Sequence, residues 1–476
     1  MEPILSVAQM RIVDASSEKP IDSLMDAAGY SVALSAGSMG IGYGSVVRVL
    51  AGAGNNGGDG LVAARYLARR GATVIVHQIA TPEGDSAAGR ALVAARSAGV
   101  RLEAFGEPRD ADLIIDALFG TGLRGDLEEI VVPWTESRMR VLAIDVPSGL
   151  DGDTGRVSGS AFTAERTATF HALKTGHVLG EGPDRCGLIE VCDIGLSGGE
   201  PSMFRFGESD VQSPVRARTV HKWSAGSVAT IGGVPGLTGA AVLAARAALA
   251  AGAGVSSIFT TEDTARIYET LAPDLISIQA SESMTWRDHS SEVLSLLDPF
   301  DVLILGPGLE PVSTVFVERL IEQFRGTVIV DAGALKALAR LNCLVNRDRP
   351  TVLTPHAGEF QRLTGDPPTP ESAGWLAETT EAVVVLKGNP TVVTGDRQII
   401  VDSGGPELAT IGTGDVLAGM IAALAARGVP ALEAACSAVY LHGKAGSRLA
   451  ATRTVTAPGL VEEVAALMSD GGAASR

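Results

Sequence analysis

The segment Gly412-Thr413-Gly414-Asp415 combines two kinds of chemistry, and the apolar run that follows it predicts the start of a helix. Glycines at a helix N-terminus leave backbone N–H groups free to bind phosphate, and the helix dipole favours an anion there. Asp415 would repel that phosphate unless its carboxylate served a different group. The alternative is structural, since an acid in the first turn stabilises a helix through the dipole alone.

Two further residues of the C-terminal half follow apolar runs and could share this chemistry. Lys387 comes after four apolar residues, so its charge needs an anionic partner, and a phosphate would serve. His356 stands at a predicted strand exit, where a histidine is more often a structural hydrogen-bonding residue than a catalyst. Both residues are therefore candidates for a site shared with Asp415.

The N-terminal half carries a second group of polar residues, made of Asn55–Asp59, Asp116, Asp145 and Ser148. Their amides, carboxylates and hydroxyls are oxygen ligands for a hard cation, and the nearby glycines permit close approach of phosphates. Taken singly, each has a structural explanation. Asn55–Asp59 could be a tight turn in which Asp59 caps the next helix. Asp116 and Asp145 could be acids that end strands, and Ser148 could be a turn residue. Lys174 could meet a ligand phosphate, although solvent exposure is the default for a lysine.

Short β-branched runs alternate with alanine-rich helical segments in both halves, which is typical of parallel sheets covered by helices. Ligands of such sheets bind beyond the carboxyl ends of the strands, where the polar residues above also lie. The predicted strands are 45–50, 72–79, 112–118 and 140–146, followed by 227–233, 301–308, 326–333, 350–358 and 382–388. A polar, proline-bearing segment at 208–223 separates the halves. The sequence therefore predicts an α/β fold with two domains, residues 1–213 and 214–476.

Composition restricts the class of protein. Hydrophobic residues make up 46% of the chain and charged residues 20%, which predicts a globular protein. A net charge of −17 argues against binding to nucleic acid or to an anionic membrane. The four cysteines form no CxxC pair and the N-terminus lacks a signal-peptide pattern, so we expect a reduced, cytoplasmic setting. Glycine- and alanine-rich helical faces favour a homo-oligomer.

The N-terminal half resembles the NAD(P)H-hydrate epimerase domain of the bifunctional nicotinamide-nucleotide repair proteins, through LMDAAG, GAGNNGGDG, DALFGTG, AIDVPSGLDGDTG and TFHALKTG. The resemblance implies a Rossmann-like, three-layer domain that interconverts the R and S hydrates of NADH and NADPH. It implies that Asp145 contacts substrate and carries a proton, and that His171, which replaces a small residue, alters the pocket. The implied potassium ligands are Asn56, Asp116 and Ser148. The implied substrate-binding residues are Asn55, Asn56, Gly57, Gly58, Asp59, Gly120, Thr121, Gly122, Leu123, Arg124, Gly125 and Asp126.

The C-terminal half is similar to the ADP-dependent NAD(P)H-hydrate dehydratases of the ribokinase-like fold, through HKWSAGSVATIGG, LILGPGL, IVDAGAL, LTPHAGEF, VVLKGNPTVV and LATIGTGDVLAG. The resemblance implies that the S hydrate returns to NADH or NADPH while ADP gives AMP and phosphate, with Mg²⁺ bridging phosphates. Asp415 would be the general base, and Ile411, which replaces a small residue, would change only packing. The implied hydrate-binding residues are Ala240, Gly308 and His356. The implied nucleotide-binding residues are Lys387, Gly388, Asn389, Pro390, Thr391, Gly412, Thr413 and Gly414.

Three alternatives stay open. A ribokinase-like kinase for a vitamin precursor would share the chemistry of Asp415 but would leave the N-terminal half as a binding module. The N-terminal half could instead be an interaction module without catalytic activity, which its acidic charge and intact motifs argue against. A chain with one inactive domain is the third alternative.

Overall fold

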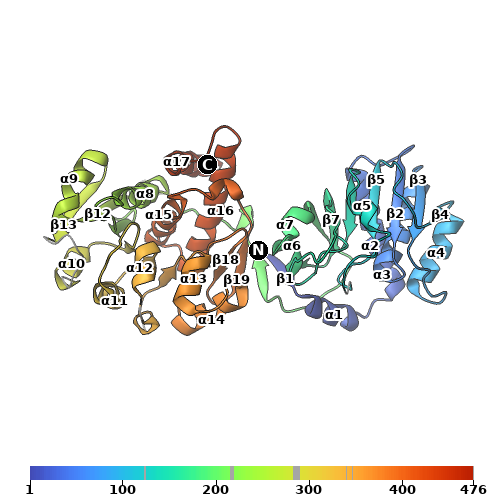
Figure 1. Ribbon diagram of the computed structural model, residues 1–476, viewed down its shortest axis with the longest axis horizontal. Coiled ribbons are helices and arrows are strands. Elements are labelled where there is room, and N and C mark those ends of the chain that lie inside the picture. Colours follow the sequence, from blue (N-terminus) through green and yellow to red (C-terminus); the bar gives the residue numbers. More distant parts are fainter. Residues whose placement is uncertain (123–124, 215–218, 282–289, 339, 346, 475–476) are drawn as a thin grey trace. The chain divides into compact units, whose positions relative to one another are not determined.

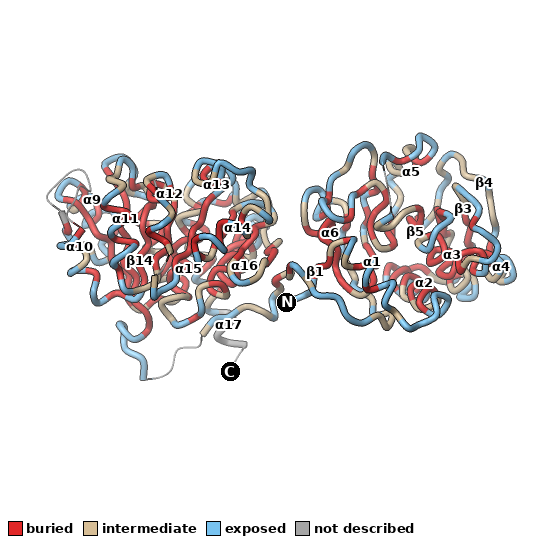
Figure 2. Tube along the Cα trace, turned by 90° about the horizontal axis from the view of Figure 1, so that it is seen from below, coloured by how far each residue is buried: buried red, intermediate tan, exposed pale blue. Residues whose placement is uncertain are grey.

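The computed structural model describes residues 1–122, 125–214, 219–281, 290–338, 340–345 and 347–474. It divides the chain into two compact units, Glu2–Met203 and a C-terminal unit made of Met1 and Phe204–Arg476 (Figure 1). Strand β10 (Met203–Arg205) stands at this division, and the boundary predicted at residues 213 and 214 lies shortly after it. In each unit the buried residues follow the interior strands and the inner sides of the helices (Figure 2).

The N-terminal unit is built on a seven-stranded sheet in the order β4-β3-β2-β5-β6-β7-β9. Every neighbouring pair is parallel, as the alternation of β-branched runs and helices predicts. The seven strands are β2 (Val46–Ala51), β3 (Thr73–Gln78), β4 (Arg101–Ala104), β5 (Leu113–Ala117), β6 (Val141–Ile144), β7 (Arg166–Phe170) and β9 (Leu188–Cys192). Strand β1 (Glu2–Leu5) pairs in parallel with β8 (Leu173–Lys174), outside the seven-stranded sheet.

Alternation along β2 distributes its side chains between two cores. Val47 and Val49 pack with the helices on one face, and Leu50 packs on the other face with Trp134. Successive strand residues point to opposite faces, so this run buries both sides of the sheet. The helices of the unit are α1 (Val7–Ser16), α2 (Ile21–Ser38), α3 (Asn55–Arg69), α4 (Ala87–Ser97), α5 (Val132–Thr135), α6 (Thr175–Val178) and α7 (Gly182–Arg185).

The neighbouring strands β2 and β5 mark the point where the strand order of this sheet reverses. From β2 the chain continues through α3 to β3 on one side, whereas from β5 it continues to β6 on the other. The connections that follow β2 and β5 leave the carboxyl edge of the sheet in opposite directions. In parallel sheets of this kind, a crevice opens between two such connections. The start of α3 and the loop after β5 therefore flank the place where a ligand is expected.

In the described residues, the sheet of the C-terminal unit runs in the order β13-β12-β11-β14-β15-β16-β17-β18-β19, followed by the strand β10 named above. The sheet is parallel from β13 to β17 and antiparallel from β17 to β19. The strands are β11 (Ser227–Ile231), β12 (Val255–Thr261), β13 (Ile276–Ser281), β14 (Val302–Leu305), β15 (Thr327–Val330), β16 (Thr351–Leu353), β17 (Val383–Leu386), β18 (Thr391–Thr394) and β19 (Gln398–Val401).

Helix α15 (Thr413–Ala426) is almost wholly buried against this sheet, because its apolar residues run all round it. Its Val416 and Met420 share one core with Ile304 of β14 and Ile329 of β15. This packing fixes the N-terminus of α15 beside the carboxyl ends of those strands. The other helices of the unit are α8 (Thr238–Ala250), α9 (Glu262–Leu271), α10 (Ser290–Leu297), α11 (Thr314–Gln323), α12 (Ala332–Ala337), α13 (Ala357–Thr364), α14 (Pro370–Thr380), α16 (Ala431–Ala450) and α17 (Ala457–Ala474).

Each of the nine predicted strands is present, and the predicted α/β class with two mainly parallel sheets is confirmed. Sequence patterning missed the other strands of these two sheets, which are β4, β7, β9, β10, β12, β13, β18 and β19, although β12 and β18 are buried throughout. Across the described residues, the helices lack the combination of length and apolar character that crossing a bilayer needs.

Candidate active sites

The turn before α15 has the form expected of an anion-binding site. Gly412 is the N-cap, with φ 89° and no side-chain cap, so the first N–H groups of the helix are left for a ligand. A Cβ at Gly412 would lie 2.7 Å from Leu243 Cδ1 and 2.9 Å from Ala457 Cβ. Both the left-handed backbone and this close packing therefore require glycine at this position.

Thr413 supports the turn through its side chain and leaves only its backbone to a ligand. Its hydroxyl lies 2.9 Å from the carbonyl oxygens of both Leu408 and Thr410, to either of which it can donate. His442 of α16 lies 2.9 Å from the Thr413 carbonyl through Nε2, so that nitrogen carries the proton. Burial lowers the pKa of His442 to about 4, which keeps the ring neutral.

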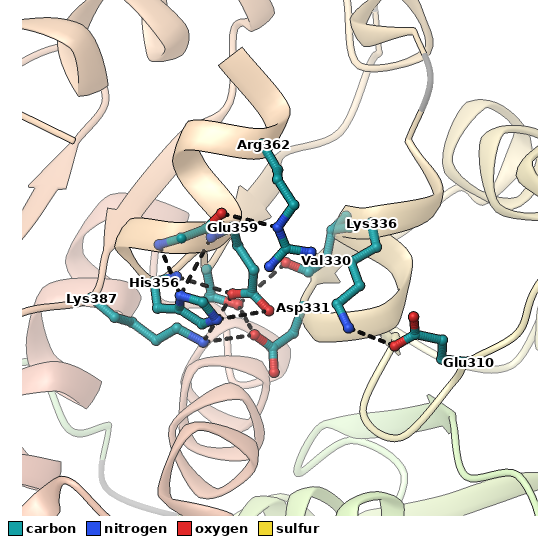
Figure 3. Close-up of polar contacts among 10 residues, drawn as sticks. Glu310, Val330, Asp331, Lys336, His356, Glu359, Arg362 and Lys387 are labelled. Atoms are coloured by element: carbon teal, nitrogen blue, oxygen red, sulfur yellow. Dashed lines mark hydrogen bonds and ion pairs between the residues drawn. The ribbon is translucent and has the colours of Figure 1, made fainter. Parts of the chain in front are cut away.

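Lys387 follows β17 and lies in a cluster of buried carboxylates (Figure 3). Its Nζ is 3.0 Å from Asp331 Oδ1 and 4.0 Å from Glu359 Oε2. Burial alone would lower the pKa of Lys387, but these two carboxylates raise it above its ordinary value. The anionic partner predicted for Lys387 is thus supplied by the protein itself, at the carboxyl end of β15.

Asp415 lies beside this cluster and shares its electrostatic field. Burial raises the pKa of Asp415 to about 7, and the carboxylates of Asp331 and Glu359 add to the rise while Lys387 opposes it. A carboxyl group with a pKa near 7 can accept a proton at neutral pH and is a stronger base than an exposed aspartate. The arrangement at the start of α15 thus places a general base next to free backbone donors.

His356 is a structural hydrogen-bonding residue, which was the alternative to a catalytic role. It is the N-cap of α13, where its Nδ1 accepts hydrogen bonds from the N–H groups of Gly358 and Glu359. Glu359 completes a capping box by accepting from the His356 N–H at 3.0 Å. Because Nδ1 accepts, Nε2 carries the proton of the neutral ring, and the half-exposed side chain leaves that donor accessible.

The other predicted residues of this unit lie on two neighbouring segments. Gly308 follows β14, and a Cβ there would lie 3.2 Å from the Cβ of Ala240 in the first turn of α8, so these two residues meet. The run Lys387–Thr391 forms the turn between β17 and β18, closed by a 3.0 Å hydrogen bond from the Thr391 hydroxyl to the Gly388 carbonyl. Ile411 was expected to change only packing, and this was wrong, because its side chain is 95% exposed.

In the N-terminal unit, Asn55–Asp59 opens helix α3 after Gly54. Gly54 is the N-cap, so the alternative that Asp59 caps the helix was wrong. A Cβ at Gly57 would lie 1.9 Å from the Gly52 carbonyl oxygen, which explains a glycine there. Asp59 is buried, and desolvation together with the charges of Asp145 and Asp14 raises its pKa well above the ordinary value.

Asn56, Gly120 and Asp145 come together at the carboxyl edge of this sheet. A Cβ at Gly120 would lie 2.9 Å from Asp145 Oδ2 and 3.2 Å from Asn56 Oδ1, so only glycine fits between them. The Asn56 amide nitrogen is buried and has no hydrogen-bond partner in the described part of the chain. A polar group in this state is available to a ligand.

Asp145 is paired with Lys174, which is buried rather than solvated. Lys174 Nζ lies 2.8 Å from Asp145 Oδ1 and donates to the Thr169 hydroxyl at 2.8 Å. Burial would raise the pKa of Asp145, but Lys174 and the nearby donors hold it below its ordinary value. Asp145 has φ 67°, an uncommon backbone conformation, and its carbonyl accepts from His177 Nε2 at 2.7 Å.

Asp116 and Ser148 are in direct contact. The Ser148 hydroxyl donates to Asp116 Oδ1 and the Ser148 N–H to Asp116 Oδ2, each at 2.7 Å. Burial raises the pKa of Asp116 to about 6, and the partners that the described residues supply are neutral donors. A buried carboxylate that lacks a cationic partner fits a site for a cation.

The loop after β5 borders a pocket of about 280 Å³. Its walls include Gly120, Thr121, Gly125 and Asp126 of this loop, and also Arg11 and Arg156. Gly122 belongs to the same loop, whereas Leu123 and Arg124 lie outside the described residues. The ring of His171 is bound to the Gly198 carbonyl, 2.9 Å from Nε2.

Sequence reasoning missed the partners that tune these candidate residues. They are Thr354 and His442 in the C-terminal unit, and Thr169 and His177 in the N-terminal unit.

Comparison with known proteins matches a different family to each half of the chain. Residues 228–465 match the family described as NAD(P)H-hydrate dehydratase, and residues 21–176 match the YjeF-related protein N-terminus. The bifunctional NAD(P)H-hydrate repair enzyme Nnr of Salinibacter ruber is 37% identical over 97% of this chain and 95% of its own. That of Moorella thermoacetica is 37% identical over 94% and 93%. The crystallised ADP/ATP-dependent NAD(P)H-hydrate dehydratase of Bacillus subtilis is 29% identical, with a TM-score of 0.47 over 54% of this chain and 94% of that one.

Proposed function

The chain belongs to the family of bifunctional NAD(P)H-hydrate repair enzymes, and we propose how its two parts divide the repair. Residues 1–213 form the epimerase domain, which interconverts the R and S hydrates of NADH and NADPH. Residues 214–476 form the dehydratase domain, which returns the S hydrate to NADH or NADPH and converts ADP to AMP and phosphate. One observation carries the dehydratase assignment: a base with a pKa of about 7, Asp415, adjoins the free N–H groups of α15.

The dehydratase domain has to remove a ring hydroxyl, which is a poor leaving group. Asp415 accepts the proton of that hydroxyl while its oxygen attacks the terminal phosphorus of ADP, and the bond between that phosphorus and AMP breaks. The N–H groups of Gly414 and its neighbours, with Lys387, stabilise the charge on the transferred phosphoryl group. Loss of phosphate, together with a proton from the neighbouring carbon, then restores the double bond of the ring.

Magnesium fits this site chiefly as a companion of the nucleotide. When bound, Mg²⁺ neutralises charge on the phosphates during transfer. Acidic side chains border the site, yet within the described ranges no three acidic, histidine or cysteine residues form a metal-binding group. Oxygens of the nucleotide phosphates would therefore supply most of its ligands. The turn Lys387–Thr391 borders the same site and would hold the rest of the nucleotide.

In the epimerase domain we assign proton transfer to Asp145. Lys174 keeps this carboxylate ionised and therefore able to accept a proton from the hydrated ring. Residues of the first turn of α3 and of the loop Gly120–Asp126 would bind the substrate around it. Potassium would be held by Asn56, Asp116 and Ser148, where it would supply the positive charge that the buried Asp116 carboxylate lacks.

The remaining assignments follow the same pattern. Ala240 and Gly308, which meet at the start of α8, would contact the S hydrate together with His356. A vitamin-precursor kinase would leave the match of residues 21–176 to the YjeF-related protein N-terminus unexplained. A homo-oligomer stays a prediction, and light scattering coupled to size-exclusion chromatography tests it.

The function is tested by mixing the purified full chain with R and S hydrates and with ADP or ATP, while following the absorbance of reduced nicotinamide. Recovery of both hydrates with ADP is expected. Recovery of the S hydrate alone would show that the epimerase assignment is wrong. A stable phosphorylated product and no reduced cofactor would point to the kinase alternative instead.

A further inference from the structure

The Lys387 ammonium group lies near two carboxylates, those of Asp331 and Asp415. Its Nζ lies 3.0 Å from Asp331 Oδ1 and 3.4 Å from where a Cβ of Gly414 would stand, so it touches the first turn of α15. Asp415 is the next residue on that turn and interacts electrostatically with the same ammonium. The lysine side chain is flexible, so whichever carboxylate holds it better decides whether Asp415 remains unpaired.

The structure favours Asp331 in this competition. Asp331 is only 2% exposed, and its Oδ1 also accepts a 2.7 Å hydrogen bond from the Thr354 hydroxyl. Thr354 stands at the end of β16, next to the end of β15 that carries Asp331. A carboxylate held by a neighbouring strand keeps its orientation, because its rotation would break that hydrogen bond.

The other acid of the cluster is less able to hold the lysine. Glu359 Oε2 lies 4.0 Å from Lys387 Nζ and is already engaged by the His356 N–H in the capping box of α13. Its Oε1 lies 3.5 Å from His356 Nε2. Asp331 therefore provides the direct contact, and Glu359 contributes at longer range.

We propose that Asp331 is a positioning residue of the dehydratase site, which holds Lys387 away from Asp415. This keeps Asp415 unpaired, and so able to take the hydroxyl proton, while the ammonium faces the phosphate bound at α15. Without Asp331, Lys387 would pair with Asp415, which would weaken the base and withdraw the cation from the phosphate. The inference rests on the proposed dehydratase function and adds to it a residue that never touches the substrate.

The charges around Asp415 determine the direction in which its pKa should change when Asp331 is replaced. Three charged groups act on it, Asp331 after β15, Lys387 after β17 and Glu359 in α13. His356, which caps α13, and His442, which is bound to the Thr413 carbonyl, complete the titratable groups nearby. Replacing Asp331 by asparagine removes a negative charge and releases a positive one, and both changes lower the pKa of Asp415.

The test is Asp331→Asn in the full chain, assayed for dehydratase kcat and KM from pH 5.5 to 9. We expect kcat at pH 8 to fall by about ten- to a hundredfold and its acid limb to move by about one pH unit or more toward acid. KM for the S hydrate should change little. An acid limb that stays in place or moves toward alkaline pH would overturn the proposal.

A matched control and a milder variant separate positioning from folding. Glu310→Gln removes a carboxylate from the neighbouring exposed pair with Lys336, at 2.6 Å, and should leave the pH profile unchanged. Thr354→Val keeps both charges but frees Asp331, so the acid limb should move in the same direction by a smaller amount. If Asp331→Asn does not fold, this variant decides the question, and an unmoved profile counts against the proposal.

A direct readout distinguishes this inference from the function on which it rests. Carbon-13 NMR of aspartate carboxyls, with Asp415 assigned through Asp415→Asn, reports its pKa without any substrate. A lower Asp415 pKa in Asp331→Asn supports the positioning role even if the wild-type chain proved inactive on hydrates. If the Asp415 pKa is unchanged in Asp331→Asn while the wild-type chain is active on hydrates, Asp331 is not a positioning residue and the proposed function is unaffected.

Discussion

Asp145 and Lys174 form a buried ion pair in the N-terminal unit, with 2.8 Å between Oδ1 and Nζ. The pair holds Asp145, the candidate proton carrier, in its ionised form. Each charge can be buried because the opposite charge of its partner compensates it. The relationship differs from a surface ion pair, since Lys174 is only 1% exposed. Its removal should therefore affect stability as well as activity.

Asp145→Asn should lower the free energy of unfolding of the N-terminal unit by about 3–5 kcal/mol, because it leaves the Lys174 ammonium buried without a counter-charge. Calorimetry of the full chain measures this, and epimerase activity should be lost. The double variant Asp145→Asn/Lys174→Met should regain most of the stability and none of the activity. Glu165→Gln, which breaks the exposed pair with Arg140, is the control and should cost less than about 1 kcal/mol.

Dehydratase activity should depend on pH through Asp415. Its pKa is raised to about 7, and a general base works only when ionised, so kcat/KM should fall about tenfold per unit as pH drops below about 7. Asp415→Asn should keep nucleotide binding and lose turnover by several orders of magnitude. An acid limb near pH 4 in the wild-type chain would contradict the assignment.

His442 should make the C-terminal unit less stable in mild acid. Its pKa is lowered by burial from the ordinary 6.5 to about 4, so the unfolded chain binds a proton between those values and the folded chain does not. Stability should therefore be complete above about pH 6.5 and decline as pH falls toward 4, by on the order of 3 kcal/mol. His442→Gln retains an N–H for the Thr413 carbonyl, and its unfolding midpoint should vary less over this range.

Gly412→Ala should impair nucleotide binding more than it impairs folding. The left-handed backbone costs about 1–2 kcal/mol for alanine, and the new Cβ would press on Leu243 and Ala457 at the anion-binding turn. We expect at least a tenfold loss of ADP affinity by calorimetric titration. Gly428→Ala at the other end of α15 is the matched control, since Gly428 has φ 86° and no atoms within 4 Å of its Cβ position. It should lose stability alone.

Potassium should support the epimerase half. Replacing K⁺ by tetramethylammonium at constant ionic strength should lower both the epimerase rate and the thermal stability of the N-terminal unit, because the buried Asp116 carboxylate would lose the proposed cation. Asp116→Asn should be insensitive to this exchange. If Asp116→Asn keeps the full response to K⁺, the ion binds elsewhere.

The parallel architecture was predictable because it depends on local patterns. Runs such as 45–50 and 382–388 predict strands, and the rule on carboxyl ends then places Asp116, Asp145 and Lys387 at sheet edges. The partners of these residues were not predictable in the same way. Lys174 meets Asp145 only because the chain turns back after β7, and no spacing in the sequence encodes that approach.

Local signals also left some partners open or pointed in the wrong direction. Lys387 has an anionic partner within the protein, Asp331 at the end of another strand of the same sheet, which the residue types alone did not indicate. Asp59 looked like a helix cap because it follows two glycines, yet α3 already begins at Asn55. For both Lys387 and Asp59, the residue type alone allowed more than one role, and the folded structure showed the contacts that the residue makes.

The anion-binding turn at α15 is built from uncharged backbone donors, with the Thr413 hydroxyl committed to the preceding loop. Dipoles act over a short range, whereas the net charge of −17 on the whole chain acts over the Debye length. We therefore expect a nucleotide to be held by contact once it has arrived, and not to be attracted from a distance. Added salt should then speed nucleotide association by screening the repulsion, while the contacts that hold the bound nucleotide should change little.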